Sequence, residues 1–402
     1  MPRSQPQPPS MVKARLSPEA AALAEEVVAL RRHLHQHPEV AFAEHATAKL
    51  VEDYLRQLGI PVKRMAGTGL VGLIDSHRPG PTIMLRADMD ALPVTEENTH
   101  AYVSRNAGVM HACGHDAHVA MLLAAAKALK RRGLTRGRVK LCFQPGEEGA
   151  DGGGAMVQAG VLADPPVDFA FALHVWLPVD AGRIAVLDGP CMAAVDEFTL
   201  EVAGKGGHAA YPHGSVDPVL ASAAIVMNLQ SVVSRNVNPF APAVLTVASI
   251  NAGTAFNIIP PRAVMRGTVR TTSNEVRKLA ERRLRAITRA TAAAFGCKAS
   301  IDFRRMLGVT VNDPAKAEFV RGVARDVLGA RRIVAAEPSM GGEDFSRYAE
   351  RVPAVFVFLG ARNRARGLDF PHHHPRFDLD EDVLPLGVEL HLRVAAAFLA
   401  GG

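Results

Sequence analysis

Residues 116–143 read DAHVAMLLAAAKALKRRGLTRGRVKLCF, and this stretch decides the fold class. Its first half predicts a helix over 116–130 that begins at Asp116, because apolar residues recur there at helical spacing. Val139–Phe143 is a short apolar run of the kind that forms buried strands. Since another such run, Thr82–Ala87, precedes the helix, the pattern predicts strands and helices that alternate around a parallel sheet.

The same alternation continues on both sides of this stretch. A first helix is expected over Pro18–Gln36, with Ser17 as its N-cap. The other expected elements are helices over Ala43–Leu58, Pro314–Leu328 and Glu381–Leu399, and strands over Val71–Asp75, Phe169–Leu173 and Ala354–Leu359. We therefore predict an α/β domain with a mostly parallel central sheet, built from residues 16–190 and 304–402.

Residues 191–303 interrupt that domain with a different pattern. The expected elements are strands over Phe198–Val202, Val244–Ile250, Ala263–Arg270 and Lys298–Phe303, and helices over Val216–Val233 and Asn274–Phe295. Their order, β-α-β-β-α-β, predicts an inserted α+β domain of the ferredoxin-like type. Residues 1–15, which are rich in proline and glutamine, are expected to form a disordered tail.

Composition narrows the functional classes. The chain has 402 residues and a formal charge of +6, but its basic residues are scattered, so we expect no nucleic-acid partner. No apolar run approaches the roughly 20 residues of a membrane span, so we expect no membrane association. The four cysteines are too few and too widely spaced for a disulfide framework, which fits a reducing cytoplasm.

The richest cluster of chemically active side chains is His111–His118, which reads HACGHDAH. Cys113 and His115 flank one glycine, so a loop there can direct both side chains to one centre. A thiolate with an imidazole suits Zn, Co, Ni or Mn better than Mg or Ca. Asp116 and His118 are expected to orient those ligands. The alternative is that these histidines only cap a helix or pack.

Further candidates follow the predicted strands. Glu147 and Glu148 come after Val139–Phe143, and adjacent carboxylates point in different directions, so one can bind metal while the other handles protons. His174 ends another strand, either as a ligand or as a structural residue. Asp88 and Asp90 follow the strand Thr82–Ala87. They could ligate metal, hold an imidazole, or be solvated loop acids.

Six motifs occur in order along the chain: Arg86–Pro93, His111–His118, Gln144–Glu148, Gly207–Ala210, Asn257–Pro260 and Met340–Phe345. With these motifs the chain resembles the aminoacylase and carboxypeptidase family of metallopeptidases, and more narrowly its amidohydrolase branch. That branch contains hippurate hydrolases, N-acyl-amino-acid deacylases and auxin–amino-acid conjugate hydrolases.

The resemblance implies a zinc-exopeptidase-like domain with a dinuclear metal centre, and an inserted lid and dimerisation domain. Glu147 matches the catalytic base of the family. The histidines at 372, 373 and 374 leave the final ligand position open, although His373 matches the family motif best. The ligand positions that match are Cys113, His115, Glu148, His174 and His373.

The resemblance also implies an activity. We expect a metal-dependent amidohydrolase that cleaves a small N-acyl amino acid to a carboxylic acid and a free amino acid. His208 and Asn257 of the inserted domain would help to hold the substrate, with this histidine reaching the site of a partner subunit. Arg262 is a further candidate for the substrate carboxylate. A cytoplasmic homodimer or dimer of dimers is expected.

Two other functions fit parts of the sequence. In the first, Cys113 is a nucleophile and His115 its base, which would make the chain a thiol hydrolase. Two residues so close together, with other metal-type ligands nearby, argue against it. In the second, the chain binds metal without catalysis, and the presence of Glu147 argues against that.

Overall fold

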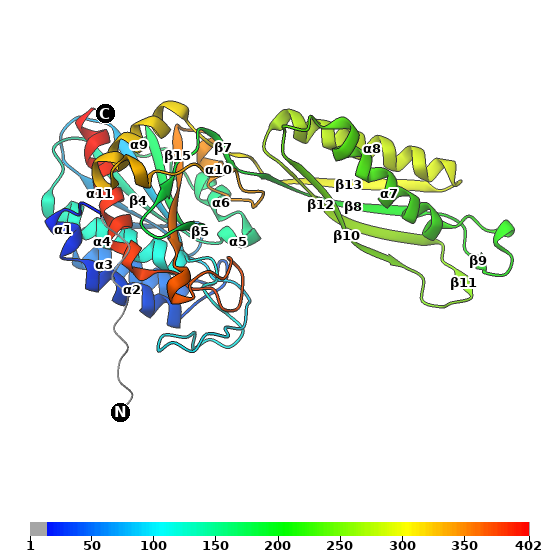
Figure 1. Ribbon diagram of the computed structural model, residues 1–402, viewed down its shortest axis with the longest axis horizontal. Coiled ribbons are helices and arrows are strands. Elements are labelled where there is room, and N and C mark those ends of the chain that lie inside the picture. The colour runs from blue at the N-terminus through cyan, green and yellow to red at the C-terminus, as the bar shows by residue number, and fades with distance from the viewer. Residues whose placement is uncertain (1–13, 402) are drawn as a thin grey trace. The chain divides into compact units, whose positions relative to one another are not determined.

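The computed structural model describes residues 14–401, so most of the tail expected over 1–15 lies outside the described residues. The chain divides into two compact units (Figure 1). Unit 1 comprises the chain up to Gly189 with Val311–Glu337 and Arg347–Gly402, and unit 2 comprises Pro190–Thr310 and Pro338–Ser346. The segment 338–346, expected in the first domain, thus belongs to unit 2, where the Ala193 N–H donates to the Gly341 carbonyl.

Unit 1 is built on a seven-stranded sheet of order β1-β2-β4-β3-β5-β15-β6. Its strands are β1 (Val62–Met65), β2 (Gly69–Asp75), β3 (Thr82–Asp88), β4 (Arg138–Gln144), β5 (Phe169–Asp180), β6 (Ile184–Ala185) and β15 (Ala354–Arg362). The four central strands, β4, β3, β5 and β15, are mutually parallel. The outer pairings are antiparallel, so the sheet is mixed and the expected mostly parallel sheet is wrong at its edges. One reason is that a short turn folds β1 directly back onto β2.

Helices surround this sheet. They are α1 (Pro18–Ala21), α2 (Ala24–Gln36), α3 (His45–Gln57), α4 (His115–Arg132), α5 (Glu147–Ala150), α6 (Gly152–Gln158), α9 (Pro314–Leu328), α10 (Ser346–Ala349) and α11 (Leu384–Ala400). The helix α4 is buried along most of its length and packs against α2 and α11. Ser17 caps α1 as expected, since its side chain accepts the Ala20 N–H, but the expected helix Pro18–Gln36 is interrupted at Leu23.

The segment Glu381–Ala400, which contains α11, is apolar enough to cross a membrane by length and composition alone, with a mean hydropathy of 1.6. We did not expect such a run, because Glu389, His391 and Arg393 interrupt it. Its most apolar window is 72% buried inside the protein, and α11 packs against α4 and α9. These contacts are typical of the core helix of a globular unit.

Unit 2 has the element order β-α-β-β-α-β. The elements are β8 (Ala194–Ala203), α7 (Pro218–Asn236), β10 (Ala243–Ala252), β12 (Arg262–Thr271), α8 (Asn274–Ala294) and β13 (Lys298–Leu307). The four strands form an antiparallel sheet of order β10-β12-β8-β13. Alternate residues Phe198, Leu200 and Val202 of β8 are buried with apolar residues of α7 and α8, which gives unit 2 its own core.

Two pairs of short strands connect or extend these units. The chain passes between the units within β7 (Gly189–Met192) and β14 (Thr310–Asn312). A short ribbon of unit 2 pairs β9 (Gly207–His208) with β11 (Ile258–Ile259) in antiparallel fashion. The remaining short helices are η1 (Pro212–Gly214), η2 (Ala330–Arg332), η3 (Arg364–Arg366) and η4 (Glu381–Val383).

Candidate metal centre

The turn that begins α4 places two predicted ligands. Gly114 caps α4 with a φ of 89°, in the left-handed region that favours glycine. A Cβ at this position would lie 2.3 Å from Cγ2 of Val175, so the close approach of β5 also requires glycine. Cys113 and His115, on either side, are thereby fixed at the start of the helix.

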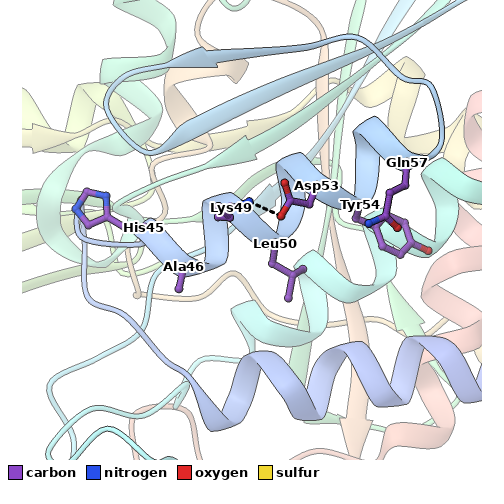
Figure 2. Close-up of a pocket in the computed structure, with 7 residues that line it drawn as sticks. All are labelled: His45, Ala46, Lys49, Leu50, Asp53, Tyr54 and Gln57. Carbon is purple, nitrogen blue, oxygen red and sulfur yellow. Dashed lines mark hydrogen bonds and ion pairs between the residues drawn. The ribbon is translucent and has the colours of Figure 1, made fainter.

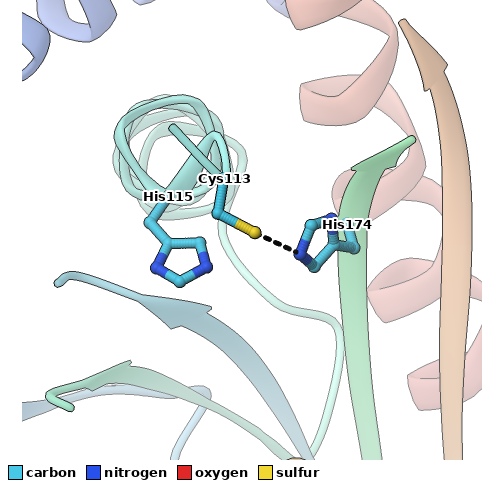
Figure 3. A group of neighbouring side chains, drawn as sticks. All are labelled: Cys113, His115 and His174. Carbon is cyan, nitrogen blue, oxygen red and sulfur yellow. Dashed lines mark hydrogen bonds between the residues drawn. The ribbon is translucent and has the colours of Figure 1, made fainter. Parts of the chain in front are cut away.

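The first group of ligands consists of Cys113, His115 and His174, whose ligand atoms all lie within 4.8 Å of one another (Figure 3). Figure 3 shows the cysteine and His115 at the start of α4 and His174 on β5. Sγ of Cys113 lies 3.6 Å from Nε2 of His174. A sulfur and a nitrogen on one tetrahedral ion are about 3.6 Å apart, given metal bonds of about 2.3 and 2.0–2.1 Å. The geometry therefore fits an ion held between them.

His174 lies within β5 and does not end it. We expected the strand to stop at Leu173, but it continues to Asp180, because Val175 and Trp176 pair with β15 beyond the histidine. The His174 side chain is nevertheless buried beside Cys113. The greater length of β5 therefore does not separate the imidazole from the thiol.

A second group overlaps the first. It consists of Cys113, Glu148 and His373, again with ligand atoms within 4.8 Å of one another. Nε2 of His373 lies 3.3 Å from Oε1 of Glu148, close to the separation of about 3.3–3.4 Å expected for two ligands on a tetrahedral ion. Because the thiol belongs to both groups, all five ligands expected from the sequence form one cluster, which we call the candidate metal centre.

In His115 and His174, hydrogen bonds at Nδ1 leave Nε2 available to bind metal. Nδ1 of His115 lies 2.8 Å from the Asp90 carbonyl, and Nδ1 of His174 lies 2.7 Å from the Val175 carbonyl. Each Nδ1–H therefore donates to the backbone, and each Nε2 keeps its lone pair. Nε2 of His115 and Oε1 of Glu148 are buried without a hydrogen-bond partner, as expected of atoms that bind a cation.

The structure distinguishes the three consecutive histidines. Nε2 of His372 lies 2.9 Å from the Val175 carbonyl, and Nδ1 of His374 accepts the Arg376 N–H at 3.0 Å. His373, by contrast, belongs to the ligand group of Cys113 and Glu148 described above. Its φ of 67° and its N–H bond to the Ala112 carbonyl turn the ring towards Glu148.

Asp90 connects the two loops that carry the ligands. Its carbonyl accepts from His115, and its carboxylate accepts the N–H groups of Glu147 and Glu148 at 3.0 and 2.8 Å. These bonds hold the pair of glutamates next to the start of α4. The carboxylate atoms of the pair lie within 4.8 Å of a ring nitrogen of His115.

Asp88 and His118 form a second layer around the centre. Oδ1 of Asp88 lies 2.6 Å from Nδ1 of His118, whose Nε2 accepts the Val175 N–H at 3.0 Å. Both nitrogens of His118 are thus engaged within the protein. Arg86 donates to the other oxygen of Asp88, which lies 3.6 Å from Nε2 of His115.

Asp116 faces a network that we did not predict. It accepts from Nε of Arg31 at 2.9 Å and lies 2.7 Å from Nδ1 of His35, both on α2 and both fully buried. The signal was present in the sequence, because Arg31 and His35 share the buried face of α2 with Val27 and Leu34. Charged residues at core positions of an amphipathic helix point to a buried partner.

The local electrostatics favour a bound cation. Burial and the nearby Glu148 carboxylate raise the pKa of the Cys113 thiol well above its usual range. Burial would raise the pKa of Asp88, but Arg86, His115 and His118 hold it well below its usual value. Since thiolate is the form that binds metal, a divalent ion would offset the raised pKa of Cys113 and release the thiol proton.

The substrate-binding candidates lie in unit 2. His208 and Asn257 are exposed neighbours on the β9–β11 ribbon, where the Ala209 N–H donates to the Asn257 carbonyl at 3.0 Å. Nδ1 of His208 accepts the Ala210 N–H, which leaves Nε2 for other contacts. Arg262 begins β12, and its exposed side chain lies 3.9 Å from Glu201.

A surface pocket of about 670 Å³ lies elsewhere in unit 1, along α3 (Figure 2). It is lined by one helix alone, and its lining includes no residue of the candidate metal centre. Figure 2 shows an ion pair between Lys49 and Asp53 across this surface. The pocket offers no acid–base pair held in a buried setting, so it is not the candidate active site.

A mixed α/β unit with clustered thiol, imidazole and carboxylate ligands beside a further carboxylate defines a metallohydrolase. The chain belongs to peptidase family M20/M25/M40, whose model matches residues 84–397. The chain is therefore a hydrolase that acts on amide bonds, as expected from the resemblance. Neither the thiol hydrolase nor the non-catalytic binding protein receives support from this membership.

Three relatives indicate the branch of the family. Thermostable carboxypeptidase 2 of Saccharolobus solfataricus is 40% identical and covers 92% of this chain and 95% of its own length. An N-acetyl-L-cysteine deacetylase of Bacillus subtilis is 39% identical, with coverages of 90% and 86%. An IAA-amino acid hydrolase of Arabidopsis thaliana (ILR1-like 4) is also 39% identical, with coverages of 93% and 86%. The expected amidohydrolase branch is confirmed.

A solved structure supports the two-metal centre. A dinuclear metal-binding peptidase of the M20 family from Bacillus subtilis matches with a TM-score of 0.82 and 33% identity. It covers 94% of this chain and 99% of its own. Together with the ligand groups described above, this likeness gives the chain a cofactor of two divalent metal ions.

The first prediction concerns Gly114. Gly114→Ala should lower the free energy of unfolding by about 1–3 kcal/mol and reduce metal content, because the new Cβ collides with Val175 and the backbone is left-handed. Gly108→Ala is the matched control: its φ is 75°, but nothing lies within 4 Å of the added Cβ. Urea unfolding and elemental analysis test both variants. Equal losses in the two would show that the contact with β5 does not position the ligands.

Proposed function

We propose that this protein hydrolyses N-acyl amino acids of the hippurate, N-acetyl or indoleacetyl type. The observation that carries the proposal is the pair Glu147 and Glu148. The backbone N–H groups of both residues donate to the Asp90 carboxylate. Glu148 belongs to a ligand group that contains Cys113, and Glu147 lies close to Glu148. That arrangement offers a metal ligand and a proton acceptor side by side.

The five residues of the candidate metal centre would hold two divalent ions, drawn from Mn, Zn, Co or Ni because the ligands are soft or borderline. Ions at this position supply an acidified water and polarise the amide carbonyl. Glu147 is buried and is not a member of the two ligand groups with Cys113 described above. We assign it the role of accepting the water proton and delivering it to the departing amine.

Unit 2 would act as a ferredoxin-like lid and dimerisation domain. His208 and Asn257 are exposed, as residues that meet a substrate on closure would be. Apolar side chains of the same unit, including Phe240, Phe256 and Ile258, are also exposed. Because β10 is an edge strand, its free hydrogen-bonding groups suit pairing with a second subunit. A homodimer or dimer of dimers in the cytoplasm completes the proposal.

The relatives restrict the substrate class. Two of them are named for deacetylation of N-acetylcysteine and hydrolysis of IAA–amino acids, and a third is a carboxypeptidase. These substrates share a carboxylate on the amine side of the bond that is cleaved. Carboxypeptidase activity on short peptides is therefore the second candidate. A screen of benzoyl-, acetyl- and indoleacetyl-amino acids against N-blocked dipeptides would separate the two.

The second prediction separates the two glutamates. Glu147→Gln should keep its metal but lose on the order of 100-fold or more in kcat, because an amide cannot accept the proton. Glu148→Gln should lower metal content instead, because the ligand charge is lost. Steady-state kinetics on benzoylglycine and elemental analysis of each variant provide the measurements. A Glu147→Gln enzyme within a few-fold of the parent kcat would remove Glu147 from the mechanism.

The third prediction tests a site shared between subunits. His208→Ala and Glu147→Gln chains should each be inactive alone, and mixing them should restore part of the activity if His208 serves the partner's centre. The readout is turnover after mixing, with subunit exchange followed by native mass spectrometry. Complete exchange without any recovery would mean that each chain builds its own site.

The fourth prediction concerns the substrate carboxylate. Benzoylglycinamide should be hydrolysed with a kcat/KM at least about tenfold below that of benzoylglycine, because a charge-assisted hydrogen bond contributes roughly 1.5–3 kcal/mol. If Arg262 and Asn257 hold the carboxylate, Arg262→Gln and Asn257→Ala should bring the kcat/KM values for the two substrates closer together. Equal efficiency of the parent on both compounds would identify a general amidase.

A further inference from the structure

A second cluster of ligand-type side chains lies in unit 1 outside the candidate metal centre. It consists of His35 on α2 and of Glu96 and His100 in the loop that follows β3, and their ligand atoms lie within 4.8 Å of one another. Nε2 of His35 is 3.2 Å from Oε1 of Glu96, and Nε2 of His100 is 3.3 Å from the same oxygen. None of the three belongs to the two ligand groups around Cys113 described above.

Nε2 of His35 is within hydrogen-bond distance of Glu96, and both distances also fit two ligands of a shared cation. Ligands on one tetrahedral Zn²⁺ with bonds of about 2.0–2.1 Å are about 3.3–3.4 Å apart. A charged N–H···O bond is usually about 2.7–2.9 Å long. Both ring nitrogens of His100 are buried without a hydrogen-bond partner, which is costly for an imidazole that serves only as packing.

The surrounding contacts orient His35 and Glu96 as ligands. Nδ1 of His35 lies 2.7 Å from Oδ2 of Asp116, so Nδ1–H donates to that carboxylate, and Nε2 lies within hydrogen-bond distance of Glu96, where a bound cation would take the place of the Nε2 proton. This carboxylate–histidine pair is the usual support of a metal-binding imidazole. Oε2 of Glu96 accepts the Ser104 N–H and Oε1 accepts from Asn98, which together fix the carboxylate.

The charge of the cluster also calls for a cation. With the imidazoles neutral, as metal ligation requires, the ion pairs that connect it contain two guanidinium groups and four carboxylates, so a divalent ion would bring the network to neutrality. Tyr102 stacks on the His100 ring with centroids 3.7 Å apart and limits its movement. The groups that make up this network are Arg31, Arg32, Glu96, Asp116, Asp378 and Glu381.

We infer that His35, Glu96 and His100 form a third divalent-cation site, separate from the candidate metal centre. Two imidazoles and one carboxylate select Zn, Co or Ni, with water as a further ligand. The site ties the loop that follows β3 to α2, where the Arg105 N–H already donates to the Gln36 carbonyl. Its role is structural, because Glu96 and His100 contact neither Glu147 nor the ligands around Cys113.

Metal counting tests the site. After saturation with Zn²⁺ and removal of free metal, the parent should hold about one ion per chain more than His100→Gln. His45→Gln changes an exposed histidine on α3 and should match the parent. Added Zn²⁺ should also raise the Tm of metal-depleted parent more than that of His100→Gln. Activity on benzoylglycine should be similar in all three, and equal metal contents would overturn the proposal.

A measurement without substitution covers the case in which His100→Gln does not fold. Crystals of the zinc-loaded parent should show an anomalous scattering peak between the rings of His35 and His100. The two-metal centre serves as the internal reference for occupancy. If that centre is full and no peak lies between the two rings, the third site does not exist, whatever the substrate of the enzyme proves to be.

Discussion

The active region depends on the hydrogen bonds of Asp90. Its carbonyl orients the His115 ring, and its carboxylate binds two successive backbone N–H groups at Glu147 and Glu148. One residue just after β3 therefore fixes a candidate ligand from the start of α4 and the acid pair after β4. Because β3 and β4 are parallel neighbours, both loops emerge at the same sheet edge, and the short span of one aspartate is sufficient.

Support for this arrangement extends to the first ordered helices. Arg31 of α2 is fully buried and pairs with Asp116, which directly follows His115, and with Asp378 beyond the three histidines. Burying these charges costs free energy that hydrogen bonds and mutual attraction offset only when the geometry is closely defined. The network thus specifies the positions of two ligand-bearing loops, and removing Arg31 would leave two carboxylates without their principal cation.

The parts of the structure that could be predicted from the sequence are those that local signals determine. The helix α9 has the predicted bounds, since Asp313 caps it and Pro314 occupies its first position. The sequence also singled out the five candidate ligand residues, because they follow strands or precede a helix, and the structure brings them together. Long-range pairing was less accessible: β5 continues past His174 only because β15 lies beside it, and the antiparallel edge strands carry no distinct pattern. Likewise, the partner of Arg31 and His35 could not be predicted, because only the structure places Asp116 beside α2.

The composition of the candidate metal centre gives a physical reason for it to bind metal. Cys113 lies among carboxylates, and burial together with Glu148 disfavours its thiolate, so the ligand form is unstable without added positive charge. Nε2 of His115 and Oε1 of Glu148, which are buried without a hydrogen-bond partner, add a desolvation cost in the same small volume. A divalent ion bound here would relieve all of these penalties at once, because it would pair these atoms and stabilise the thiolate. Metal binding would therefore be thermodynamically coupled to the stability of this sheet edge.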